Sequence, residues 1–211
     1  MILDKGNQQE YQWMAIMNWY KKANIDDQED YSLCPEKEYA RSIGLDPDSL
    51  GYMGKGENGE AFDAGNGRII KVTSSSSEFE IAKKLLGKSG YHATIYDVQQ
   101  IGNSFIIYQE MLQMDSDIEY KYYQLQELLN QQGLPMQYLG HLDEDELSPE
   151  DKLIYDELSD FITGIENINR EYRYLGIEAS DIQPDNMGYD NQGNLKAFDL
   201  DDKGGIYNEL V

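Results

Sequence analysis

The chain has 211 residues and a hydrophobic content of 40%, enough to build the core of one compact domain, alone or with an appendage. Its formal charge of −23, from 17 basic and 40 acidic residues, repels phosphate backbones and anionic lipids, so we expect neither nucleic acid nor membrane as a partner. Cys34 is the only cysteine, which excludes an intrachain disulfide. We find no secretory signal pattern and no long apolar run, and therefore expect a cytoplasmic protein.

Two helices are predicted at the start of the chain. Apolar residues at helical spacing indicate a helix over about residues 7–23. Pro35 suits a helix start, and the helix that follows is predicted to run toward Gly44 with Tyr39 on its apolar face. We interpret residues 1–49 as an N-terminal helical extension that packs on the rest of the chain, with a partner-binding arm as the alternative.

A run of short strands is predicted from about residue 50 onward, where glycines become frequent. Residues 61–62 lead through a Gly-Asn-Gly turn into residues 68–72, which indicates a hairpin. A short helix over residues 78–86 follows, and residues 93–98 and 104–108 favour a further strand pair.

One long helix is predicted in the second half of the chain. Ser148 and Pro149 form a capped helix start, with acidic residues in the first turn. An apolar stripe then runs from Leu153 to Tyr172 on one face, and Gly176 marks the end of the helix. Such a stripe indicates core packing.

Three glycines, Gly54, Gly56 and Gly59, lie at the predicted turn between two strands. Glycines let a backbone approach an anion closely, and the free amide groups can bond its oxygens. Taken alone, turn glycines that bind no ligand are the simpler interpretation.

Lys71 lies between apolar residues on the strand that follows the glycines. A buried lysine is unfavourable unless it is paired or binds an anion, whereas a lysine on an exposed edge strand needs no partner. Glu80, on the short helix nine residues later, is the expected partner, and Glu78 is the alternative.

The segment after the long helix carries a more specific pattern. Asp181 is followed by Pro184 and Asn186, and Asp199 ends a later apolar run. Residues 190–193 predict a tight hairpin turn, which would bring Asn186 and Asp199 to neighbouring positions. Carboxylate and amide oxygens at one point suit Mg²⁺. The alternative is that these polar residues only cap a loop and a turn.

The order of these features resembles that of protein kinases: a glycine-rich hairpin, a strand lysine, a helix glutamate, a hinge, a long helix, an Asp-x-x-Pro-x-Asn loop and a late aspartate. The spacing of five residues from Asp181 to Asn186, and of thirteen more to Asp199, is that of the kinase catalytic and metal-binding segments. The resemblance covers about residues 50–202.

The part of the chain after Asp199 limits the kind of kinase that this sequence resembles. Only 12 residues follow Asp199 (211 − 199), which leaves no room for an activation segment and further helices. The chain is therefore similar to minimal or atypical kinases, such as the kinase-like domains of phage polyvalent proteins. This implies an α+β, two-lobed protein-kinase-like fold with an N-lobe over residues 50–112 and a truncated helical C-lobe over residues 113–211.

The resemblance also implies a nucleotide site. Backbone amides around the three glycines would cover the phosphates of ATP, and Lys71, held by Glu80, would bind two of those phosphates. The residues implied as the hinge that binds adenine through its backbone are Glu110, Met111 and Leu112, with Gln109 at the gatekeeper position.

A catalytic and metal site is implied in the same way. Asp181 would orient the acceptor hydroxyl and take its proton, and Asn186 and Asp199 would ligate Mg²⁺. Asp201 is either a second metal ligand or a surface acid.

The sequence departs from the kinase pattern at the catalytic loop. Ala179 and Ser180 replace the usual His-Arg pair, and Gln183 stands where a lysine is usual. We expect an ATP- and Mg²⁺-dependent phosphotransferase that acts on a hydroxyl of a protein or small molecule. The alternatives are a pseudokinase, docked to a protein partner that completes the short C-lobe, and a structural protein with a decayed cleft.

Overall fold

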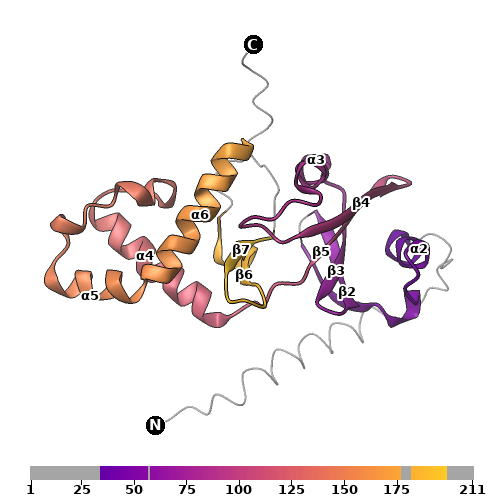
Figure 1. The fold of residues 1–211 in the computed structure, drawn as a ribbon, viewed down its shortest axis with the longest axis horizontal. Coiled ribbons are helices and arrows are strands. Elements are labelled where there is room, and N and C mark those ends of the chain that lie inside the picture. The colour runs from indigo at the N-terminus through magenta and orange to yellow at the C-terminus, as the bar shows by residue number, and fades with distance from the viewer. Residues whose placement is uncertain (1–33, 57, 177–181, 199–211) are drawn as a thin grey trace, which may run out of the picture. The chain divides into compact units, whose positions relative to one another are not determined.

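The computed structural model describes residues 34–56, 58–176 and 182–198. The chain divides into two compact units, Met1–Cys34 and Pro35–Val211. The helix predicted over residues 7–23 lies outside the described residues. The second unit has a mixed α+β fold (Figure 1).

An antiparallel five-stranded sheet forms the first half of this unit, with strand order β1-β2-β3-β5-β4. Its strands are β1 (Gly51–Lys55), β2 (Gly59–Gly65), β3 (Arg68–Thr73), β4 (Ile95–Ile101) and β5 (Ser104–Glu110). Both predicted hairpins are confirmed. The β2–β3 turn needs its Gly-Asn-Gly sequence, because Gly65, Asn66 and Gly67 all have positive φ angles, of 77°, 54° and 69°.

Two helices, α2 (Pro35–Ser42) and α3 (Ser76–Leu85), pack on opposite faces of the sheet (Figure 1). Successive residues of a strand point to opposite faces, and the two core clusters follow this alternation. Ile106 of β5 packs with Tyr39 of α2, whereas Ile107 packs with Ile81 of α3. The helix predicted from Pro35 is therefore confirmed, and it belongs to the same unit as the sheet.

Three further helices and a small hairpin make up the second half of the described unit. They are α4 (Ser116–Gln131), α5 (Pro149–Glu157), α6 (Ser159–Leu175), β6 (Met187–Tyr189) and β7 (Leu195–Ala197). Short 3-10 segments lie at η2 (Pro47–Ser49), η3 (Met136–His141), η4 (Glu144–Glu146) and η6 (Pro184–Asn186).

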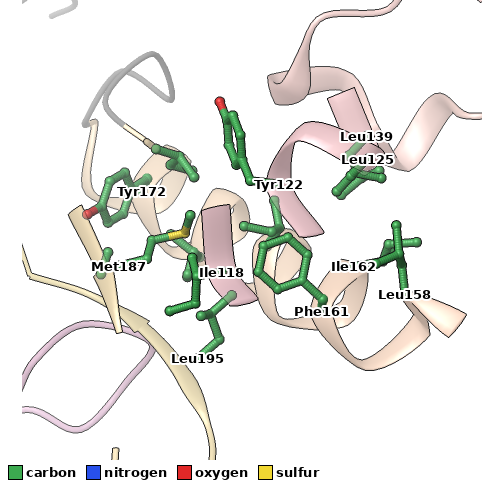
Figure 2. Close-up of a cluster of buried hydrophobic side chains, with 14 of the residues drawn as sticks. Ile118, Tyr122, Leu125, Leu139, Leu158, Phe161, Ile162, Tyr172, Met187 and Leu195 are labelled. Atoms are coloured by element: carbon green, nitrogen blue, oxygen red, sulfur yellow. The ribbon is translucent and has the colours of Figure 1, made fainter. Parts of the chain in front are cut away.

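A single hydrophobic core joins these elements (Figure 2). Its side chains come from α4, α6 and the small hairpin: Ile118, Tyr122, Leu125, Phe161, Ile162, Tyr172, Met187 and Leu195. The same cluster includes Ile81 of α3 and Ile107 of β5, so one core runs from the five-stranded sheet to the helices.

Helix α4 was not among the predicted elements, although its sequence carries the signals of a helix. Asp115 caps it by accepting a hydrogen bond from the amide of Asp117 at 3.0 Å. Ile118, Tyr122 and Leu125 recur at helical spacing and are all buried.

The single long helix predicted up to Gly176 is wrong in one respect, because the structure has two helices, α5 and α6. The chain leaves helical geometry at Leu158, with φ −90° and ψ 0°. Asp156 and Glu157 are unfavourable at the negative C-terminal end of α5, whereas Asp160 suits the positive start of α6. As a result Leu153, expected in the core, is 64% exposed.

Candidate functional site

Lys71 lies on β3, in the middle of the five-stranded sheet. Its side chain is only 16% exposed and forms an ion pair with the carboxylate of Glu78, which is 2% exposed. Two charges are removed from water here, and each is tolerated because the other is present. The alternative of an exposed edge-strand lysine is therefore wrong.

The expected pairing of Lys71 with Glu80 is also wrong. Glu80 is 54% exposed and bonds to Lys83 at 2.9 Å. The reason is the phase of α3: its buried face carries Ile81 and Ala82, and Glu78 precedes them by three and four residues on that same face. Glu80 points to solvent.

The packing of the fold requires a glycine at only one of the three positions at the β1–β2 turn. A side chain at Gly59 would clash with the carbonyl of Val72 on the neighbouring strand, so packing alone requires this glycine. A side chain at Gly54 would meet nothing within 4 Å, and the nearest atom to one at Gly56 is a carbonyl oxygen at 4.0 Å. Neither residue has a positive φ. The fold does not explain these two glycines.

The three residues predicted as the hinge, Glu110, Met111 and Leu112, are held in different ways. The amide of Glu110 donates to the carbonyl of Thr94, and the amide of Met111 donates to that of Gly67, each at 2.9 Å. Among the described residues, the amide of Leu112 donates to no backbone carbonyl. Gln109, the expected gatekeeper, is 1% exposed.

The side chain of Glu110 ties the end of β5 to the small hairpin. It accepts hydrogen bonds from Thr94, at 3.1 Å from the amide and 3.0 Å from the hydroxyl, and from Lys196 of β7 at 2.9 Å. Lys196 also pairs with Asp190 at 3.2 Å. We call Glu110, Lys196 and Asp190 the charged cluster.

The pKa values of the charged cluster shift because of these contacts. Burial alone would raise the pKa of Glu110, but the hydrogen bonds from Lys196 and Thr94 outweigh it and lower the pKa. Asp190 is also desolvated, yet hydrogen bonds from Asn194 and Gln192 lower its pKa to about 2. The pKa of Lys196 is raised, because its two carboxylate partners outweigh its burial. Sequence reasoning missed this cluster, since nothing marks Lys196 as paired.

The loop before β4 holds strand β7 in place. The amide of Ala93 donates to the carbonyl of Ala197 at 2.7 Å, and the amide of Ala197 donates to that of Tyr91 at 2.9 Å. The buried His92 contacts the carboxylate of Glu171 on α6 at 2.9 Å. Strand β7 is thus fixed by both the sheet and α6.

The hairpin predicted around residues 190–193 is confirmed. Its turn is closed by Asp190, which accepts from the amides of Gln192 and Asn194, each at 2.9 Å. The amide of Phe198 donates to the carbonyl of Asn186 at 3.0 Å, so these two residues lie side by side. The other predicted catalytic and metal residues, Asp181, Asp199 and Asp201, lie outside the described residues.

The described residues bring together groups that suit a nucleotide phosphate. The anchored Lys71 offers a cation, and the β1–β2 turn offers backbone uncovered by side chains at two glycines. For Mg²⁺, Asn186 offers one amide oxygen. Within residues 34–56, 58–176 and 182–198, no group of three His, Cys, Asp or Glu side chains could hold a metal ion.

The chain matches no protein-family model and no curated protein. No helix among the described residues is long and apolar enough to cross a membrane.

Proposed function

We propose that the chain is an ATP- and Mg²⁺-dependent phosphotransferase of the protein-kinase-like type, which transfers the γ-phosphate to a hydroxyl group. The observation that carries the proposal is the buried Lys71–Glu78 ion pair on the middle strand of the sheet. A well-packed apolar pair is often as stable as a buried ion pair. We therefore attribute the buried charge of Lys71 to binding of an anion, not to stability alone.

The geometry supports a particular role for each nucleotide-binding group. Lys71 would bind the α- and β-phosphates, with Glu78 in the role first expected of Glu80. Gly54 and Gly56 would let the backbone approach the phosphates, which explains why they carry no side chain. Of the three hinge residues, Leu112 is the one whose amide we assign to the adenine base.

The metal and acceptor groups follow the kinase resemblance. Asn186 would ligate Mg²⁺ together with Asp199, while Asp201 stays either a second ligand or a surface acid, and Asp181 would take the acceptor proton. The β6–β7 hairpin supports this assignment, because it sets Asn186 beside Phe198, the residue before Asp199. Mg²⁺, when bound, neutralises phosphate charge.

The proposal includes the two-lobed architecture. The sheet with α3, over about residues 50–112, would be the N-lobe, and residues 113–211 would be a truncated C-lobe. The charged cluster and the shared core support a fixed arrangement of the two, since both connect β5 to the elements that carry Asn186.

Thermal unfolding with and without Mg-ATP tests the proposal. Binding to the folded state at a hundred times the Kd would stabilise the wild type by about 2.7 kcal/mol and raise its Tm. We expect Lys71→Met to lose this rise, and Lys83→Met, which removes an exposed lysine, to keep it. An equal rise in all three proteins, or none in the wild type, would count against the proposal.

Turnover separates an enzyme from a pseudokinase. We expect Asp181→Ala to keep the Mg-ATP-induced rise in Tm but to lose ATP turnover. Gln183, in place of the usual lysine, favours the pseudokinase alternative, in which the chain binds nucleotide or a protein partner without phosphotransfer. Nucleotide binding with no turnover in the wild type would support that alternative. Equal, measurable turnover in wild type and Asp181→Ala would remove Asp181 as the proposed base.

A further inference from the structure

The side chain of Gln109, near the end of β5, carries a buried amide with an unused donor. The residue is 1% exposed, and its Nε2 atom has no hydrogen-bond partner among the described residues. A buried donor without a partner costs the free energy of removing it from water, and nearly all buried polar groups in native proteins are paired. The packing of the fold therefore gives no reason for a glutamine at this position.

The register of the sheet places Gln109 on the same face as Lys71. Across β3 and β5, Ile69 pairs with Gln109, and Lys71 pairs with Ile107. Paired residues of antiparallel strands point to one face, and residues two positions apart on a strand share a face. The unused amide thus lies on the face that carries the lysine proposed to bind the phosphates.

A second unused donor lies three residues further along the chain. The amides of Glu110 and Met111 both donate to backbone carbonyls, whereas the amide of Leu112 donates to no backbone carbonyl of the described chain. The carboxylate of Glu110 is already engaged in the charged cluster, so it is not free to accept a hydrogen bond from a ligand. This end of β5 therefore offers donors to a ligand.

Two donors distinguish between the purine bases. On one edge guanine presents two adjacent acceptors, N7 and O6, whereas adenine presents the acceptor N7 beside the donor amino group at N6. A donor amide that faces the N6 amino group stays unpaired, and a site built to form a hydrogen bond discriminates against a ligand that lacks the matching group.

We propose that the site prefers guanine as the base, so that GTP binds more tightly than ATP. This inference rests on the proposed function, which places a nucleoside triphosphate beside Lys71. Gln109 is then a specificity-determining residue, because its amide nitrogen donates to O6 of guanine and is left unpaired by adenine. The base takes no part in the transfer, so the bonds formed and broken at the γ-phosphate are the same for both nucleotides, and GDP leaves in place of ADP.

Isothermal titration calorimetry of the full chain with the Mg²⁺ complexes of ATP, GTP and ITP tests the proposal. ITP has the O6 atom of guanine but lacks its 2-amino group, so it isolates the contribution of O6. We expect GTP and ITP each to bind roughly ten-fold more tightly than ATP, as one additional hydrogen bond allows. ATP that binds as tightly as GTP overturns the proposal. ITP that binds no better than ATP also overturns it, because the 2-amino group would then carry the selectivity.

Gln109→Met replaces the amide by an apolar chain of similar size. We expect the affinity for GTP to fall roughly ten-fold, to the level of ATP. Without nucleotide, the Tm of the variant should not fall, because no hydrogen bond within the protein is lost. A Tm lowered by several degrees would show that the fold itself uses the amide, and would overturn the proposal. So would a selective loss of ATP affinity, since the amide oxygen would then face the base.

Gln100→Met on the neighbouring strand β4 is the matched control, because Gln100 is exposed and its amide donates to the carbonyl of Gly102 at 3.2 Å. It should bind the three nucleotides as the wild type does, and an equal loss of GTP affinity in both variants counts against a specific role of Gln109. The result also separates this inference from the function on which it rests. ATP binding with weaker GTP binding removes the base preference alone, whereas binding of none of the three nucleotides removes the proposed phosphotransferase.

Discussion

At the scale of single residues, Glu78 and Glu80 differ by two positions and have opposite environments. Glu78 lies on the buried face of α3 and pairs with Lys71, while Glu80 is solvent-exposed and pairs with Lys83. The spacing of the apolar residues separates them, because Glu78 lies three and four residues before Ile81 and Ala82 on the buried face of α3, and Glu80 does not. Ser75 caps the helix, so α3 begins at Ser76, two residues before the start we expected.

We predict that Glu78→Gln destabilises the protein by about 3–5 kcal/mol, because it leaves the ammonium group of Lys71 buried beside a neutral amide. Glu80→Gln removes only an exposed ion pair and should change the free energy of unfolding by less than about 0.5 kcal/mol. Urea unfolding of both variants measures the difference. A similar loss in the two would contradict the pairing seen in the structure.

The glycines of the β1–β2 turn give a second prediction. Gly59→Ala places a methyl group against the carbonyl of Val72, and we expect a loss of about 1–3 kcal/mol in stability. Gly54→Ala meets no protein atom and should unfold within about 0.5 kcal/mol of the wild type. Its methyl group would hinder nucleotide approach, so the rise in Tm with Mg-ATP should shrink. Unchanged nucleotide binding in Gly54→Ala would remove the proposed role of that glycine.

At the scale of elements, the charged cluster connects β5 to the β6–β7 hairpin, and its contribution depends on pH. The pKa of Asp190 is lowered from its ordinary value of 3.8 to about 2, so the unfolded state takes up a proton first as pH falls. The stabilisation, about 2 kcal/mol, is complete above the ordinary value and is lost as pH falls toward 2.

Acid unfolding of Asp190→Asn tests this contribution. The variant should be less stable than the wild type at neutral pH, and the difference should shrink between about pH 4 and pH 2. Asp145→Asn, which removes a carboxylate that is 99% exposed, is the control and should follow the wild type. A difference that stays constant with pH would mean that the ionised carboxylate is not what stabilises the hairpin.

Most elements could be predicted because they carry a regular sequence pattern. The break between α5 and α6 was missed because it interrupts such a pattern. The Gly-Asn-Gly turn fixes the β2–β3 hairpin, and Ser148 with Pro149 fixes the start of α5, because each is a local constraint on the backbone. The break at Leu158 depends on end charges that act over one turn, and apolar spacing continues through it.

The candidate site was predictable only in part, for the same reason. Lys71 and the 190–193 turn follow from local sequence. The link from Glu110 to Lys196 joins residues 86 positions apart, and no local pattern encodes it. Helix α4 was overlooked even though its cap and apolar spacing are ordinary.

At the scale of the whole molecule, the net charge of −23 predicts a salt-dependent stability. Like charges repel more strongly in the compact state, and added salt screens this repulsion. We expect the Tm, measured by thermal unfolding, to rise as sodium chloride is added. A fall in Tm over the same range would indicate that the exposed ion pairs, which salt screens, outweigh the general repulsion.

The position of α2 has a practical consequence for anyone who shortens the chain. Tyr39 and Ala40 are completely buried against Ile70, Ile106 and Tyr108, and the hydroxyl of Tyr39 donates to Asp97 at 2.9 Å. A fragment that begins at β1 would lack α2 and would expose the apolar face of the sheet that α2 covers. Such an exposed apolar face favours self-association. Expression trials should therefore place their upstream boundary before Pro35.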